Sequence, residues 1–143
     1  MTSRTLAKRI AELAISKKAH HIVLMDLRKL SAATDFFVVC TADSATQVKA
    51  VSDAVMEGTE RIGVTVWHSE GQRALQWVLL DYVDVVVHVF HKEVRSFYSL
   101  ERLWSDAKLH PVVDEGKRMK ILPATSSILL RKSPAKKARR ASA

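Results

Sequence analysis

The segment from Trp77 to Phe90 constrains the fold of this chain more than any other. It consists of two hydrophobic runs that are separated by a polar corner at residues 81–84. Short runs rich in Val and Leu and bounded by turn residues are typical of β-strands. Because so few residues separate the two runs, we expect strands at about 75–81 and 84–91 that form an antiparallel hairpin.

The residues before and after this hairpin alternate between helical and strand patterns. Apolar residues recur at helical spacing in three segments, 3–18, 44–63 and 93–107. Short apolar runs indicate further strands at 20–27, 36–40 and 64–68. The order α-β-β-α-β-β-β-α predicts an α/β fold with a mixed sheet of about five strands flanked by helices.

Two helix starts carry capping signals. Ser3 is the expected cap of the first helix. Ser44 precedes the second helix and Gln47 follows three residues later, the spacing of a capping box.

The charge of the chain is concentrated at its C-terminal end. Residues 1–108 contain 14 Lys/Arg and 13 Asp/Glu, whereas residues 109–143 contain 9 and 2. The second segment also contains all three prolines. We therefore expect one balanced domain at 1–108 and a basic, mostly disordered C-terminal extension at 109–143. The whole-chain pI of about 9.9 thus reflects the extension and not a basic domain.

Composition also limits the compartment. No apolar run approaches the roughly 18 to 20 residues of a membrane span, and the N-terminal pattern differs from a signal peptide. Cys40 is the single cysteine, so internal disulfides and cysteine metal clusters are excluded. Its apolar surroundings predict an inert core thiol. A reducing, cytoplasmic location fits these features.

The sequence contains no recognisable catalytic or cofactor-binding motif. The four glycines form no phosphate-binding loop. In a D-x-D pair the two carboxylates lie on the same face of a strand and can bind one metal ion, but Asp81 and Asp84 are three residues apart. This spacing favours a role in the turn over a metal site. His88 is expected to be a satisfied, half-buried strand residue, and the adjacent His20 and His21 should point to opposite faces of a strand. We therefore expect no metal site and no cofactor.

The first hairpin strand is apolar on both faces. Trp77, Leu79 and Asp81 share one face, and Val78, Leu80 and Tyr82 share the other. Either helices cover both faces, or one face anchors a protein interface through its aromatic residues. The sequence leaves open which face is exposed.

Several linked motifs resemble the ribosomal silencing factor family, also called Iojap-like. The strongest are Trp77-Val-Leu-Leu-Asp-Tyr-Val-Asp-Val-Val-Val-His-Val-Phe90 and Arg95-x-Phe97-Tyr98-x-Leu100-Glu101-Arg102-Leu103-Trp104-x-Asp106-Ala107. Three shorter segments agree: Asp26-Leu27-Arg28, Ser31 to Val38, and Ser44-x-x-Gln47-Val48. The resemblance covers about residues 3–108.

The resemblance implies a fold similar to nucleotidyltransferases without their catalytic residues, and hence no enzyme. Such proteins dock on the fourteenth protein of the large ribosomal subunit and block joining with the small subunit when nutrients are scarce. Many are homodimers when free. The family is bacterial and cytoplasmic, with organellar stroma or matrix as the alternative. The resemblance assigns the partner contact to Arg73, Trp77, Leu79, Leu80, Asp81, Tyr82 and Asp84.

Some features depart from the family or lie outside it. Val83 stands where the family usually has Gly, and Ala42-Asp43 replaces a Gly-containing turn. The basic extension either contacts ribosomal RNA through Lys136, Lys137, Arg139 and Arg140 or is a solvated tail. The rival function is a metal-dependent nucleotidyltransferase.

Overall fold

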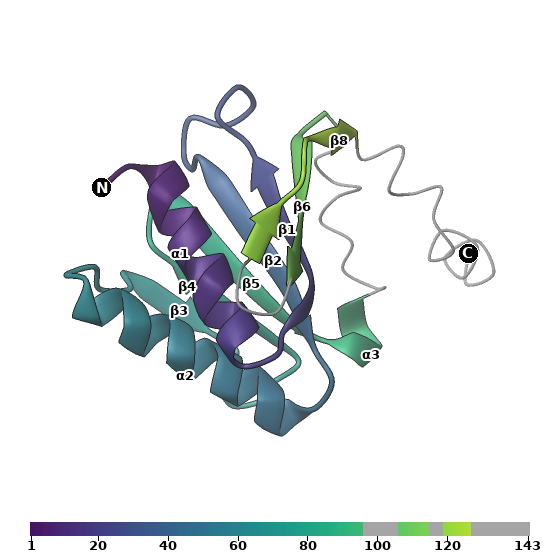
Figure 1. Ribbon diagram of the computed structural model, residues 1–143. Helices are drawn as coiled ribbons and strands as arrows, with labels where there is room; N and C mark the ends of the chain where they lie inside the picture. The colour runs from purple at the N-terminus through teal and green to yellow at the C-terminus, as the bar shows by residue number, and fades with distance from the viewer. Residues whose placement is uncertain (96–105, 115–118, 127–143) are drawn as a thin grey trace.

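The computed structural model describes residues 1–95, 106–114 and 119–126, and all of its strands belong to one sheet (Figure 1). The elements in chain order are α1 (Ser3–Ser16), β1 (His20–Asp26), β2 (Phe36–Ala42), α2 (Ala45–Arg61), β3 (His68–Glu70), β4 (Trp77–Asp81), β5 (Val85–His91), α3 (Lys92–Arg95), β6 (Lys108–Asp114), β7 (Met119–Ile121) and β8 (Thr125–Ser126). The described part of the chain thus confirms a mixed α/β fold.

The strand order is β3-β4-β5-β2-β1-β6-β7, with β8 paired to β6. β2 and β5 run parallel, with Val38 opposite Val87. The other paired strands are antiparallel, including the predicted hairpin of β4 and β5. The parallel pair lies near the middle of the sheet because α2 carries the chain back across it between β2 and β3.

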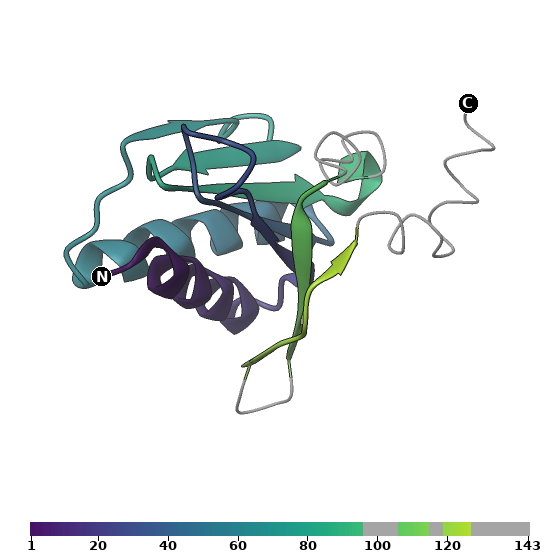
Figure 2. The same cartoon turned by 90° about the horizontal axis from the view of Figure 1, so that it is seen from above.

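Both long helices lie on the same face of the sheet (Figure 2). Their apolar stripes, which include Leu6, Ile10, Val48 and Val51, pack onto the strand residues that point toward them. A smaller buried cluster lies on the opposite face and contains Val23, Met25, Leu27, Val39, Phe90, Ala107 and Leu109. The sheet is therefore apolar on both faces, but the two long helices cover only one of them.

The helix ends combine local capping with tertiary contacts. Ser3 does not cap α1: the side chain of Thr2 accepts from the Thr5 amide, while Ser3 Oγ donates to Asp35 Oδ2 at 2.8 Å. The cap of α2 is confirmed, because the Gln47 amide donates to Ser44 Oγ at 3.1 Å.

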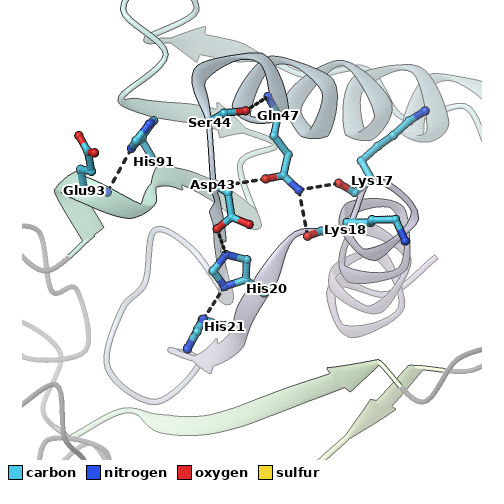
Figure 3. A network of polar contacts seen from close by, with 9 residues as sticks. All are labelled: Lys17, Lys18, His20, His21, Asp43, Ser44, Gln47, His91 and Glu93. Carbon is cyan, nitrogen blue, oxygen red and sulfur yellow. Dashed lines mark hydrogen bonds and ion pairs between the residues drawn. The ribbon is translucent and has the colours of Figure 1, made fainter.

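The side chain of Gln47 does more than the capping box predicts. Its Oε1 accepts from the amide of Asp43, and its Nε2 donates to the carbonyls of Lys17 and Lys18, both at 3.1 Å. The start of α2 is therefore tied to the end of α1 (Figure 3).

Two predicted elements differ from the structure. The strand expected at 64–68 forms only from His68 to Glu70, because Val64 and Val66 pack against the core before the chain meets β4. The helix expected at 93–107 begins one residue earlier, as α3, and its residues 96–105, with the stripe of Phe97, Leu100 and Trp104, lie outside the described residues.

The segment after residue 108 was predicted to be mostly disordered, and for residues 109–114 and 119–121 this is wrong. β6 pairs with the second edge of β1, and β7 and β8 pair with β6. Leu109 and Val112 are buried there. Among the described residues, the sheet therefore has eight strands and not about five. Residues 127–143, with the four predicted RNA-contact residues, lie outside the described part.

Candidate functional site

The corner between β4 and β5 is a tight turn held by its own polar groups. The Tyr82 amide donates to the Val85 carbonyl at 2.8 Å, and the Asp84 amide donates to the Tyr82 carbonyl at 3.0 Å. Asp81 Oδ1 accepts from the Val83 amide at 2.7 Å. The Asp81 carboxylate thus acts as a turn residue, which is the predicted alternative to metal binding.

Val83 occupies an unfavourable backbone conformation in this turn, with φ of 74°. A hydrogen bond from residue i+2 to residue i around such a residue has the pattern of a γ-turn, which is strained for a β-branched side chain. Glycine would adopt this conformation without a steric penalty. Val83 in place of the family's usual glycine therefore strains the backbone of this turn, but the hairpin still forms.

One face of β4 belongs to the core beneath the helices. Val78 and Leu80 are fully buried and Tyr82 is 7% exposed. Tyr82 Oη lies 2.8 Å from Thr59 Oγ1 of α2, and burial raises the pKa of its phenol. Leu80 and Tyr82 are therefore not at the surface, contrary to the prediction that they contact a partner. Strand alternation places them opposite to Trp77 and Leu79.

The other face of β4 is partly exposed. Trp77, Leu79 and Asp81 are each of intermediate exposure. β3 extends this face, because His68 lies opposite Asp81 and Glu70 lies opposite Leu79 in the ladder. We call these five residues the β3–β4 face. It combines an indole and an aliphatic side chain with two carboxylates, which suits protein recognition better than catalysis.

Two other predicted contact residues lie in the connections at the ends of β4. Arg73, in the loop between β3 and β4, and Asp84, in the hairpin corner, are both exposed. His68, Glu70 and the neighbouring Trp67, which is 71% exposed, were not among the predicted contact residues. The apolar pattern of this segment predicted a strand that ends at His68. The pairing of His68 and Glu70 with β4 could therefore not be predicted from the sequence.

Trp77 is held by aromatic neighbours on β5. Its Nε1–H donates to His88 Nδ1 at 3.1 Å, and its ring stacks on Phe90 with centroids 4.9 Å apart. The ring of His88 in turn meets Phe37 of β2 edge-on at 4.6 Å.

His88 differs from the predicted satisfied, half-buried residue. It is only 4% exposed, and its Nε2 is buried with no hydrogen-bond partner among the residues that the structure describes. Burial, reinforced by the Arg95 charge, lowers the pKa of His88 to about 3. The imidazole is therefore neutral at physiological pH.

A second polar cluster lies where the parallel strands β2 and β5 end (Figure 3). His20 Nε2 lies 2.7 Å from Asp43 Oδ1, and His20 Nδ1 lies 2.5 Å from His21 Nδ1. Burial and the neighbouring His20 lower the pKa of His21, and the hydrogen bond with His20 lowers the pKa of Asp43.

Strand alternation predicts that the two adjacent histidines point to opposite faces of the sheet. Their rings instead face each other. β1 is irregular between His20 and Val23, and His21 has φ of 49°, which turns its ring toward His20. Even so, the described residues contain no group of three or more His, Cys, Asp or Glu side chains that could hold a metal ion.

This end of the sheet is where open α/β folds bind ligands. Here the cap of α2 is Ser44, and the preceding residue, Asp43, brings a negative charge that is unfavourable for a phosphate group at this end. Cys40, close by in β2, is buried, and burial raises the pKa of its thiol to about 12. Neither group is disposed for nucleotide binding or nucleophilic attack.

The structure thus defines a small α/β protein with both long helices on one face of the sheet and a partly exposed Trp side chain of β4 on the other. The chain belongs to the family described as "Ribosomal silencing factor during starvation", whose model matches residues 1–142. This confirms the resemblance that the sequence motifs predicted.

Curated relatives agree with this assignment. The chain is 38% identical over 109 residues to ribosomal silencing factor RsfS of Bacillus subtilis, covering 76% of this chain and 92% of the relative. It is 35% identical over 103 residues to the chloroplastic protein Iojap of Zea mays, covering 72% of this chain and 45% of the relative.

Solved structures support the fold. A crystal structure of a protein from Chromobacterium violaceum matches with a TM-score of 0.71 at 36% identity, covering 73% of this chain and 87% of that one. A second, from Bacillus halodurans, matches with a TM-score of 0.65 at 36% identity, covering 71% of this chain and 94% of that one. No helix in the described part of the chain is long and apolar enough to cross a membrane.

Proposed function

We propose that this protein silences translation by binding the large ribosomal subunit and sterically preventing its joining with the small subunit. Membership of the ribosomal silencing factor family is the observation that carries the proposal. The mechanism needs no chemical step, because a rigid domain bound at the subunit interface excludes the other subunit by its volume. Nutrient limitation is the condition under which we expect it to act.

The proposed partner is the fourteenth protein of the large subunit, and the proposed contact is the β3–β4 face. Trp77 and Leu79 supply apolar area, and Asp81 supplies a carboxylate beside them. Arg73 and Asp84 form the rim. Leu80 and Tyr82 contribute indirectly, because they are buried on the α2 side of β4 and keep this strand rigid. Aromatic anchors of this kind often each contribute about 2 kcal/mol or more to binding.

A nucleotidyltransferase activity is the rival proposal, and the local geometry disfavours it. Metal-dependent transfer needs two carboxylates that converge on the same ions. Asp81 is engaged by the Val83 amide, and Asp84 follows it three residues later, across the corner. Titration with Mg-ATP separates the proposals: we expect no heat of binding at micromolar protein, and clear micromolar affinity would favour the enzyme.

Three further expectations accompany this function. The basic residues Lys136, Lys137, Arg139 and Arg140 add affinity for ribosomal RNA by releasing counterions, which makes that part of binding sensitive to salt. The free protein is a homodimer. Its compartment is the bacterial cytoplasm, where ribosomes are found.

Sucrose-gradient sedimentation with purified subunits tests the proposal. The wild-type protein is expected to sediment with the large subunit alone and to reduce the fraction of joined particles. Trp77→Ala should lose most of this association. Leu30→Ala is the matched control, because Leu30 is an exposed apolar residue, 43% exposed, in the loop between β1 and β2. A wild-type protein that ignores large subunits, or lets them join freely while bound, would refute the proposal.

A further inference from the structure

The strongest unexplained feature of the described residues is the polar pairing of Trp77 and His88 inside an apolar cluster. Trp77 and Phe90 are directly opposite in the β4–β5 ladder, as are Leu79 and His88, so all four lie on the same side of the sheet. An indole N–H inside an apolar cluster needs an acceptor, but a buried imidazole is a costly way to supply one at a strand position.

The hydrogen bond determines the protonation of His88. Nδ1 accepts from the Trp77 Nε1–H at 3.1 Å, so it carries no proton, and a neutral imidazole must then carry its proton on Nε2. This Nε2–H is the buried group that has no partner among the described residues. Within the described part of the chain, one buried donor is therefore unsatisfied, and in exchange a correctly oriented acceptor faces Trp77.

The neighbours of His88 leave the ring little freedom to turn. Phe37 meets it edge-on with centroids 4.6 Å apart, and Phe90 lies parallel to it at 6.3 Å, with an interplanar angle of 14°. A ring flip would turn a carbon toward the Trp77 Nε1–H in place of the Nδ1 acceptor and would break this hydrogen bond. The orientation of the indole is thus determined by a residue on another strand.

We infer that His88 is a positioning residue that orients the Trp77 indole for docking to the partner protein. This inference depends on the proposed function, because it assigns His88 a role in the contact made by the β3–β4 face. His88 itself is too buried to touch a partner. Its role is to reduce the number of indole orientations before docking, which lowers the entropic cost of association.

Two substitutions separate positioning from packing. His88→Leu is of similar size and has no acceptor, so it should release the Trp77 Nε1–H while removing the unsatisfied donor. His88→Asn places an amide oxygen near the position of Nδ1 and should restore the bond. Loss of one neutral hydrogen bond predicts roughly three- to tenfold weaker binding for His88→Leu, with most of it regained by His88→Asn.

Binding of each full-length variant to purified large subunits, measured by sedimentation over a range of subunit concentrations, gives the affinities. Proton–nitrogen NMR of the indole groups, with the Trp77 signal assigned by Trp77→Phe, gives the second readout. The Trp77 Nε1–H should be protected from hydrogen exchange in the wild type and in His88→Asn. In His88→Leu it should exchange freely. Urea unfolding should find His88→Leu no less stable than His88→Asn.

The outcomes distinguish the two levels of the proposal. If the wild-type protein fails to bind large subunits, the proposed function fails. If the wild type binds and His88→Leu binds equally well, or Trp77 protection is unchanged by that substitution, the positioning role is refuted while the function stands. A parallel loss of affinity and stability in both variants would indicate packing alone and would also overturn the inference.

Discussion

At the scale of single residues, the described part of this protein places four non-glycine residues in left-handed backbone conformations, namely Lys18, His21, Leu75 and Val83. Lys18 follows the end of α1, His21 lies in the irregular part of β1, and Val83 forms the hairpin corner. Lys18 has its carbonyl bound by Gln47, and His21 has its ring bound to His20. Val83 is stabilised only through its backbone amide, which makes it the simplest test of strain.

Replacing Val83 with Gly should raise the free energy of unfolding by about 1 kcal/mol, because removal of Cβ relieves the left-handed strain. The side chain is 52% exposed, so little packing is lost. Urea denaturation measures the change. Val83→Ala is the control: it keeps Cβ and should change stability far less. Equal gains in both variants would show that strain at Cβ is not the cause.

His88 should make stability depend on pH. Its pKa is about 3 in the folded protein, so the unfolded chain binds a proton as pH falls below 6.5 while the folded protein does not. The free energy of unfolding therefore decreases from pH 6.5 toward pH 3. The slope from this group is about 1.4 kcal/mol per pH unit, or about 2 kcal/mol between pH 6.5 and pH 5.

Urea unfolding of the wild type and His88→Asn at pH 7 and pH 5 checks this dependence. The variant should lose about 2 kcal/mol less than the wild type between the two values. The pKa of His21 is also lowered, but this residue is present in both proteins and cancels from the comparison. Identical losses in the two proteins would contradict a neutral, buried His88.

At the scale of elements, the N-terminus of α2 is the best-defined local structure and was predicted from two residues. Ser44 Oγ accepts from the Gln47 amide, as the spacing indicated. The further contacts of Gln47 with the end of α1 were not predictable, because they depend on how the helices pack. Residues local in sequence thus determine the cap, and tertiary contacts extend it.

Ser44→Ala should reduce the free energy of unfolding by about 1 kcal/mol, since it leaves an amide of the first turn without its acceptor. Thr46→Ala is the matched control, because Thr46 is exposed in the same turn and does not cap the helix. Chemical denaturation of the three proteins gives the comparison. Helix propensity alone would make Thr46→Ala neutral or slightly stabilising, so a loss in this variant as large as that in Ser44→Ala would contradict a specific role of the cap.

At the scale of the whole molecule, the sheet continues through β6, β7 and β8, so part of the C-terminal segment belongs to the folded domain. Leu109 is fully buried beside Met25 and Leu27, and β6 pairs along β1 from Lys108 to Val112. The basic residues 136–140 lie well beyond this pairing in the sequence. A test of the tail must therefore remove residues after 126 and leave the strands intact.

A chain that ends at residue 126 should unfold at the same temperature as the full protein and retain most of its binding to large subunits, with a weaker dependence on salt. A chain that ends at residue 107 should be strongly destabilised. Burial of Leu109 alone is worth about 1.5–3 kcal/mol, and an unpaired β1 edge favours aggregation. Circular dichroism melting and sedimentation compare the two. Equal stability of both truncations would contradict a structural role for β6.

The sequence alone determined the local elements and the family. Two short apolar runs separated by a polar corner predicted the β4–β5 hairpin, helical periodicity predicted α1 and α2, and linked motifs between residues 3 and 108 indicated a ribosomal silencing factor. These signals succeed because each depends on residues that are close in the chain.

Only the tertiary structure decided which surface is exposed and where the sheet ends. Both long helices pack on one face, so Leu80 and Tyr82 are buried while Trp77 and Leu79 stay partly exposed. β6 joins β1 across more than eighty residues of chain. Strand pairing of this kind depends on cross-strand packing and on a free edge, neither of which a local pattern contains.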